Sequence, residues 1–97
     1  MNIIMFEIVT STKFLKDLKL LKKRSIADLY SLQQVIEMLA KKGHRGLDRK
    51  HNPHKLSGDY KGYWECHVKP DLLLIWDEKE QINLLGLIRT GTHSDLF

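Results

Sequence analysis

The spacing of apolar residues changes once along the chain, and this change constrains the fold more than any other feature of the sequence. Between residues 14 and 39 the apolar side chains recur every three or four positions, which is typical of amphipathic helices. From residue 63 onward they alternate or form short continuous runs, which is typical of strands. This pattern predicts an α+β domain with its helices on one face of a sheet.

The expected elements follow the order β-α-α-β-β-β. A first strand covers residues 4–9, and two helices follow, the second capped by Ser25 and stopped by Gly43. The two helices should form a hairpin on one face of a small antiparallel sheet, within a single domain over residues 1–97. The other strands should form a meander and are expected at residues 63–68, 72–76 and 82–88, with a turn at 77–80.

A chain of 97 residues with 42% hydrophobic residues suffices for one domain with one two-layer core. Its single cysteine, Cys66, excludes an intrachain disulfide and a zinc site built from several thiolates, and this favours a reducing cytoplasm. The first seven residues lack the basic leader of a signal peptide, and no apolar run approaches the roughly 18 residues that cross a membrane. We therefore expect a cytoplasmic protein with no membrane association.

The positive charge is concentrated in the middle of the chain. Lys and Arg outnumber Asp and Glu by 16 to 12 overall, but by twelve to four within residues 13–55. The lysines of the first helix are expected to form its solvated face. Residues 41–55 combine six Lys or Arg with three His and almost no apolar side chains. This composition predicts a mobile basic loop suited to phosphate groups, and hence an anionic partner such as nucleic acid or an acidic protein.

Histidine suits proton transfer at neutral pH, because its unperturbed pKa is about 6.5. His67 ends one predicted strand and Asp71 begins the next, so these two residues should flank one tight turn. His93 follows the last strand and, with Arg89, is expected near the same region. Alternation along the strand places three polar side chains on the face opposite the helices, namely those of Tyr63, Glu65 and His67.

Each of these residues also has a plainer interpretation. His51 and His54 form an H-x-x-H pair, but two imidazoles without further ligands are a weak indication of a metal site. His44 is expected at the surface, His67 could be a buried structural histidine, and Asp71 could serve the turn alone. Residue spacing by itself predicts a small basic α+β domain with an ionisable face, and no more than that.

Three separated segments carry a resemblance to a known family: residues 54–63 (HKLSGDYKGY), 65–75 (ECHVKPDLLLI) and 89–97 (RTGTHSDLF). They are similar to the pattern H-x-L-x-G, K-G-Y-x-x-x-H-x-x-P-D and G-[ST]-H-x-x-L-F of the YafQ-type branch of the RelE/ParE toxin superfamily. The resemblance extends over the whole chain and implies a RelE-like microbial ribonuclease fold.

The resemblance implies the toxin component of a bacterial type II toxin–antitoxin system. Such a protein is a cytoplasmic, metal-independent endoribonuclease, or mRNA interferase, with no cofactor. It cleaves mRNA, commonly on the ribosome, and so inhibits translation and growth. The implied partners are a cognate antitoxin, mRNA and the ribosome, with operator DNA bound only through the toxin–antitoxin complex.

The resemblance also implies roles for particular residues, and the catalytic set matches His54, His67, Asp71 and His93. Metal-free cleavage uses the ribose 2′-OH as nucleophile and needs a base, an acid and cations around the phosphate. We interpret His93 as the acid and Asp71 or His67 as the base, with the alternative that Asp71 only orients His67. The expected contacts to substrate come from Arg89 beside the phosphate, Phe97 and Tyr63 on the bases, and Lys50, Lys55 and Lys61 on other phosphates.

Three positions depart from the family pattern. Trp64 stands where relatives often carry Arg, Pro53 stands where an acidic residue is common, and His51 is an additional histidine that could substitute for His54. A different class of function also stays open. The alternative is a non-catalytic basic module that binds RNA or a protein target, as a ParE-like gyrase poison does.

Overall fold

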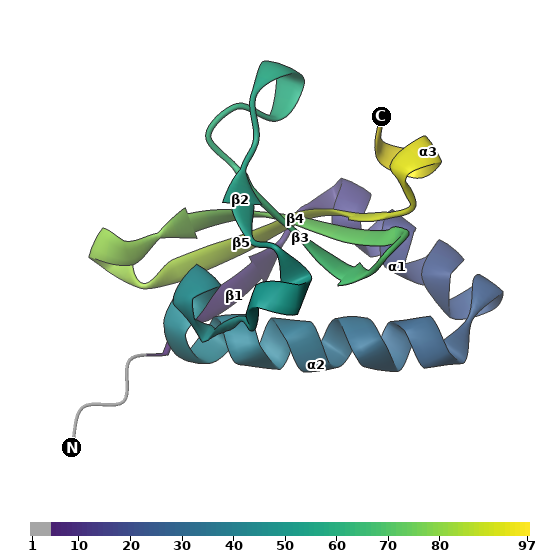
Figure 1. Cartoon of the computed structure of the whole chain (residues 1–97), viewed down its shortest axis with the longest axis horizontal. Helices are drawn as coiled ribbons and strands as arrows, with labels where there is room; N and C mark the ends of the chain where they lie inside the picture. The colour runs from purple at the N-terminus through teal and green to yellow at the C-terminus, as the bar shows by residue number, and fades with distance from the viewer. Residues whose placement is uncertain (1–4) are drawn as a thin grey trace.

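The computed structural model describes residues 5–97, so the first residue of the strand predicted at 4–9 lies outside the described residues. The helices and longer strands are β1 (Glu7–Thr10), α1 (Thr12–Arg24), α2 (Ile26–Lys42), β2 (His54–Lys55), β3 (Trp64–Lys69), β4 (Leu72–Lys79), β5 (Leu84–Gly91) and α3 (His93–Leu96). The strands form one sheet in the order β1-β5-β4-β3-β2. In Figure 1, α2 lies along one side of the sheet, while α3 and the β2–β3 connection project on the other side.

Both long helices begin at a capping serine, and the cap at Ser25 is the one that the sequence predicts. The hydroxyl of Ser11 accepts a hydrogen bond from the Phe14 N–H at 2.9 Å and caps α1, and Ser25 caps α2 in the same way at 3.1 Å. Gly43 ends α2 with a positive φ of 63°. Packing also requires glycine here, because a Cβ at this position would lie 2.7 Å from the Glu78 carboxylate. The predicted helix hairpin is therefore confirmed.

The sheet contains the predicted meander, because β3, β4 and β5 pair antiparallel in sequence order. β1, however, pairs with β5 in parallel, so the sheet is mixed rather than wholly antiparallel. Local periodicity cannot predict this pairing, because all the other long helices and strands except α3 lie between β1 and β5 in the sequence. β4 also continues to Lys79 by pairing with β5, and the turn expected at 77–80 lies at Glu80–Ile82 instead.

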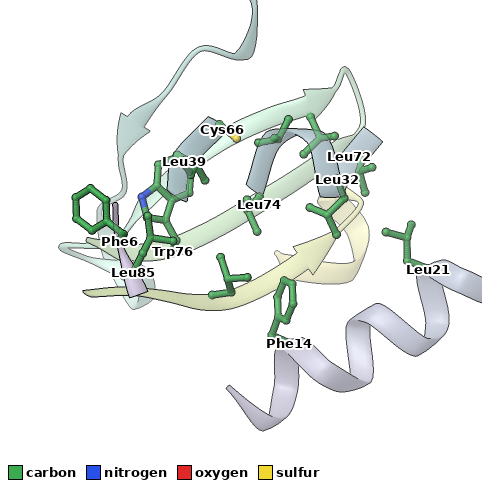
Figure 2. Packing of buried hydrophobic residues seen from close by; sticks show 13 residues of the cluster. Phe6, Phe14, Leu21, Leu32, Leu39, Cys66, Leu72, Leu74, Trp76 and Leu85 are labelled. Atoms are coloured by element: carbon green, nitrogen blue, oxygen red, sulfur yellow. The ribbon is translucent and has the colours of Figure 1, made fainter. Parts of the chain in front are cut away.

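The main core lies between the helices and the sheet. Phe14 from α1, Leu39 from α2 and Trp76 of β4 belong to one cluster, and all three are fully or almost fully buried (Figure 2). A smaller cluster occupies the opposite face, where Leu73 and Ile75 of β4 pack against the C-terminal residues. β4 is therefore apolar on both faces, as expected for the central strand of a sheet covered on two sides. No helix in residues 5–97 is both long and apolar enough to span a membrane.

The basic segment at 41–55 is folded, and the expectation of an open mobile loop is wrong. It contains short 3-10 helices at Gly43–Gly46 and Arg49–His51, followed by the two residues of β2. His44 is partly buried, with Nδ1 2.6 Å from Glu78 Oε2 and its ring stacked on Trp64 with centroids 4.0 Å apart. The composition of the segment did not indicate this fold. Histidine counts as a polar residue typical of loops, but its ring can also pack against other rings and form hydrogen bonds.

Candidate active site

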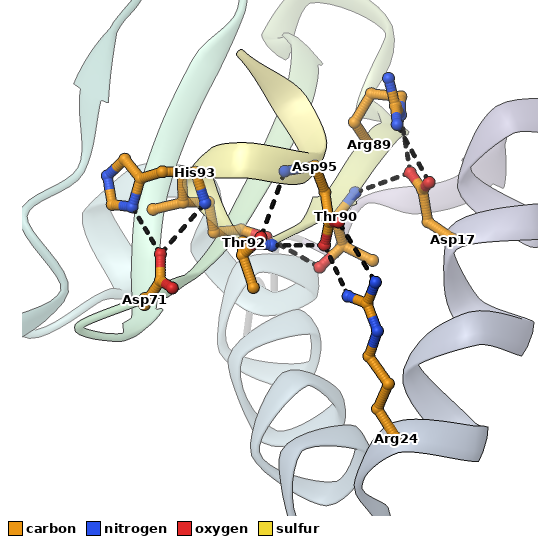
Figure 3. Close-up of polar contacts among 9 residues, drawn as sticks. Asp17, Arg24, Asp71, Arg89, Thr90, Thr92, His93 and Asp95 are labelled. Atoms are coloured by element: carbon orange, nitrogen blue, oxygen red, sulfur yellow. Dashed lines mark hydrogen bonds and ion pairs between the residues drawn. The ribbon is translucent and has the colours of Figure 1, made fainter.

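The turn between β3 and β4 and the start of α3 meet at one edge of the sheet. Because β5 pairs antiparallel with β4, Gly91 lies opposite Leu73, and the residues after β5 return to the turn that precedes β4. The Nδ1 atom of His93 lies 2.7 Å from Oδ1 of Asp71, and the His93 backbone N–H donates to the same oxygen at 3.1 Å (Figure 3). These hydrogen bonds lower the pKa of the Asp71 carboxyl. The predicted proximity of His93 and the turn is confirmed.

His67 lies between two other imidazoles. Its ring centroid is 5.8 Å from that of His93 and 6.5 Å from that of His54. The β3–β4 register shifts between His67 and Lys69, so a bulge follows His67 directly. The carboxylate of Asp71 bonds to His93 rather than to His67, so its contacts give no support to the idea that Asp71 only orients His67. The three histidines form a row along the face opposite the helix hairpin.

Glu65 lies in this row, although the sequence analysis gave it no role. It is 5% exposed, and its Oε1 atom lies 3.2 Å from Nε2 of His54, which pairs with it across β2 and β3. Its Oε2 atom is buried and has no hydrogen-bond partner among residues 5–97. A buried carboxylate oxygen without a partner is costly. The sequence could have identified Glu65 by its position, because it lies between two residues that face the site on the same strand. A carboxylate buried at such a position needs a cation or a proton beside it.

Arg89, expected near the same region as His93, is held by contacts to Asp17 and Tyr60. Its Nε and Nη2 atoms donate to the Asp17 carboxylate at 2.7 and 3.1 Å (Figure 3). Its Nη1 atom lies 3.4 Å from the Tyr60 hydroxyl oxygen. The hydrogen bonds to Asp17 raise the pKa of the Arg89 guanidinium further. Sequence analysis missed Asp17, because its partner lies 72 residues away along the chain.

The aromatic residues expected to hold bases divide into two groups. Phe97 is 65% exposed, and its ring meets that of Tyr60 edge to face with centroids 5.7 Å apart. Tyr60 and Tyr63 are both half-buried and both pack against the small cluster around Leu73 and Ile75. The ring that meets Phe97 is that of Tyr60, and the role of Tyr63 on a base stays a prediction.

The three lysines expected to contact phosphates are all exposed, but they do not share one face. Lys55 pairs with Trp64 across β2 and β3, and its Nζ atom lies 5.8 Å from the Trp64 ring centroid. Trp64 packs against the helix-side core, so Lys55 lies on the face away from the imidazoles, and its contact to a phosphate stays a prediction. Lys61 follows the 3-10 turn that ends at Tyr60, and Lys50 lies in the turn before β2.

The H-x-x-H pair does not form a metal-ligating group in the described part of the chain. The Nδ1 atom of His51 lies 2.7 Å from the His67 carbonyl oxygen and supports the strand, whereas His54 faces Glu65. A trio with ligating atoms close together does occur elsewhere, at His44, Glu78 and Glu80. There the Glu78 carboxylate also accepts the His44 N–H, and Arg45 binds Glu80 at 2.8 Å. These contacts explain the trio as part of the folded basic segment.

Residues 6–97 match the protein family described as "Bacterial toxin of type II toxin-antitoxin system, YafQ". The mRNA interferase toxin YafQ of Escherichia coli strain K12 is 36% identical to this chain over 91 residues, which make up 94% of this chain and 95% of that protein. The identity therefore extends across both proteins rather than over one shared motif.

Two solved structures have the same fold and share at least 35% of their sequence with this chain. A metal-bound toxin from Helicobacter pylori is 47% identical, with a TM-score of 0.83 over 96% of this chain and 100% of that one. YafQ in the E. coli DinJ-YafQ complex is 35% identical, with a TM-score of 0.80 over 95% of this chain and 98% of that one. The α+β architecture expected from the sequence is thus confirmed, and the chain belongs to the YafQ family of bacterial type II toxins.

Proposed function

We propose that this toxin is a metal-independent endoribonuclease that cleaves mRNA in the bacterial cytoplasm, as a single catalytic domain. The name of the E. coli relative, an mRNA interferase, supports this reaction class. The observation that carries the proposal is the row of His54, His67 and His93, which has Glu65 at one end and Asp71 at the other. A surface that only binds RNA has no need for three imidazoles and two paired carboxylates within one row.

The general acid is His93. Its Nδ1 atom faces the Asp71 carboxylate, which orients the ring and leaves the Nε2 edge to donate a proton to the departing 5′-oxygen. Because Asp71 is occupied by His93, His67 is the better base for the ribose 2′-OH. Attack of that oxygen on phosphorus expels the 5′-oxygen and leaves a 2′,3′-cyclic phosphate, which hydrolysis can convert to a 3′-phosphate.

The transition state is strongly anionic, and cations must lie around it. His54 beside the Glu65 carboxylate and Arg89 at the end of β5 occupy the positions from which they would stabilise that charge. Phe97 and Tyr60 offer aromatic faces and edges for a base, and Lys61 on the same connection offers a phosphate contact. Lys50 extends the basic surface, whereas Lys55 serves a phosphate further along the RNA.

The expected partners follow from the family. The E. coli relative is seen in a complex with DinJ, and we infer that a cognate antitoxin neutralises this toxin as well. An acidic segment of that antitoxin would complement the exposed lysines of α1 and of the basic segment. We also infer that the ribosome presents the mRNA, and that operator DNA is bound only by the toxin–antitoxin complex.

The decisive experiment is cleavage of one defined mRNA by the purified chain, with and without ribosomes and in excess chelator. The wild type should release fragments with a 2′,3′-cyclic phosphate or 3′-phosphate, and chelator should leave the rate unchanged. His93→Ala should abolish cleavage, whereas Gln33→Ala on the exposed face of α2 should not. Cleavage by His93→Ala at the wild-type rate would refute the site, and loss in chelator of the cleavage measured without ribosomes would refute the metal-free mechanism.

The non-catalytic alternative makes a different prediction. A binding module would arrest growth equally well with His93→Ala, because truncating one exposed imidazole leaves the basic surface intact. Growth arrest without RNA cleavage in both proteins would therefore favour that alternative.

A further inference from the structure

A bulge in β5 determines where the Arg89 side chain begins. Ile75 pairs with Arg89 and Trp76 pairs with Leu87, so Ile88 is an extra residue on β5. Ser11 compensates for the break in the ladder, because its hydroxyl donates to the Ile88 carbonyl at 2.7 Å and still accepts from the N-terminal turn of α1. The start of α1 is thereby bonded directly to the strand residue that precedes Arg89.

About one and a half turns further along α1, Asp17 binds the Arg89 side chain itself. Its carboxylate accepts from Nε at 2.7 Å and from Nη2 at 3.1 Å, and it also accepts the backbone N–H of Thr90 at 3.1 Å (Figure 3). The side chains are 13% exposed for Asp17 and 19% exposed for Arg89. A bidentate contact between partly buried groups fixes the orientation of the guanidinium plane as well as its position.

The Arg89 guanidinium keeps N–H groups that Asp17 does not occupy, and the Tyr60 hydroxyl lies beside one of its terminal nitrogens. A guanidinium has about five N–H donors. Asp17 takes one on Nε and one on Nη2, and Tyr60 takes one on Nη1, so one donor on each terminal nitrogen has no partner within residues 5–97. Tyr60 in turn meets Phe97, which places these free donors beside the aromatic pair. Two parallel donors of this kind match the oxygens of a phosphate.

We propose that Asp17 is a positioning residue, which holds Arg89 so that its two free N–H groups face the scissile phosphate. Asp17 itself touches no substrate and acts only through Arg89. The inference rests on the proposed ribonuclease function, and it adds a residue on α1 to a site otherwise built from the sheet and α3. It predicts that Asp17 contributes to kcat rather than to RNA binding, because the contact to Arg89 matters most when charge develops on the phosphate.

The test is a cleavage assay on a short RNA with wild type, Asp17→Asn, Arg89→Ala and the double variant. Asp17→Asn keeps the size of the side chain but removes its charge, and it should lower kcat about 10- to 100-fold with little change in KM. In the Arg89→Ala background the same substitution should have no further effect on kcat. Asp28→Asn is the matched control, because Asp28 also joins a helix to a strand, through Lys69, but does not contact Arg89.

A structural measurement separates positioning from loss of folding. The Arg89 Nε–H resonance should be resolved and slow to exchange in the wild type and lost in Asp17→Asn, while the urea midpoints of Asp17→Asn and Asp28→Asn stay similar. An active Asp17→Asn, or an equal loss of kcat in the Arg89→Ala background, would overturn the inference and leave the ribonuclease proposal in place. Absence of cleavage by the wild type would overturn the ribonuclease proposal, and this inference with it.

Discussion

Removing the Asp95 carboxylate should destabilise the protein in a way that depends on pH. Asp95 accepts hydrogen bonds from Arg24 at 2.7 and 3.3 Å, and it forms a capping box with Thr92 at the start of α3. These contacts, the one to Arg24 above all, lower its pKa from the ordinary 3.8 to about 2. The carboxylate therefore ties the α1–α2 connection to the helix that carries His93.

The magnitude follows from the difference in pKa between the folded and unfolded chain. For a buried carboxylate that difference would correspond to about 2.5 kcal/mol. The Asp95 side chain is 23% exposed, and its partner Arg24 is more exposed, so solvent screening reduces the value to about 1–2 kcal/mol. Because the folded pKa is the lower one, this contribution is complete above pH 4 or so and disappears as the pH falls toward 2.

The assay is urea denaturation of the wild type and Asp95→Asn at several pH values between 2 and 7. Asp95→Asn should be less stable by about 1–2 kcal/mol at pH 7, and the two proteins should converge near pH 2. Asp28→Asn, which removes an exposed ion pair with Lys69, should cost less than about 1 kcal/mol at pH 7. An equal loss of stability for Asp95→Asn at pH 7 and pH 2 would refute the reasoning, because the effect would then not depend on the charge.

Three further outcomes are expected. Leu39→Ala should lower the free energy of unfolding by about 2–5 kcal/mol in urea, because Leu39 is 0% exposed in the core beneath α2; a loss below about 1 kcal/mol would contradict this packing. Asp71→Asn should lower kcat for RNA cleavage, because the His93 ring loses the carboxylate that orients it; an unchanged kcat would remove Asp71 from the proposed mechanism. Cys66 should resist a thiol reagent at pH 8 until urea unfolds the chain, because burial raises its pKa to about 12; fast labelling of the native protein would contradict that burial.

The helices were predictable because their signals are local. Ser11 and Ser25 place the N-caps within three residues of the groups they bond, and Gly43 ends α2 through its own backbone freedom. The meander was predictable for a similar reason, since short connections leave antiparallel pairing as the simplest arrangement. The same logic brought Asp71, His67 and His93 together in advance, because each lies at the end of a strand.

The features that escaped sequence analysis depend on contacts between distant parts of the chain. The parallel pairing of β1 and the bond between Asp17 and Arg89 both join residues more than 70 positions apart, and no local period reports them. The prediction for the basic segment was wrong because composition does not reveal that His44 bonds to Glu78 and stacks on Trp64. Glu65 was visible on the correct face, but its burial became apparent only once β2 covered it.

The shortness of β2 makes the site sensitive to the length of the chain before it. β2 has two residues, and they face opposite sides: His54 meets Glu65, and Lys55 meets Trp64. Successive residues of a strand alternate faces, so a slip of one position would exchange the two side chains. Deleting a single residue next to Pro53 would thus bring a lysine amine to the carboxylate that now faces an imidazole, and the row of three histidines would lose one of its members.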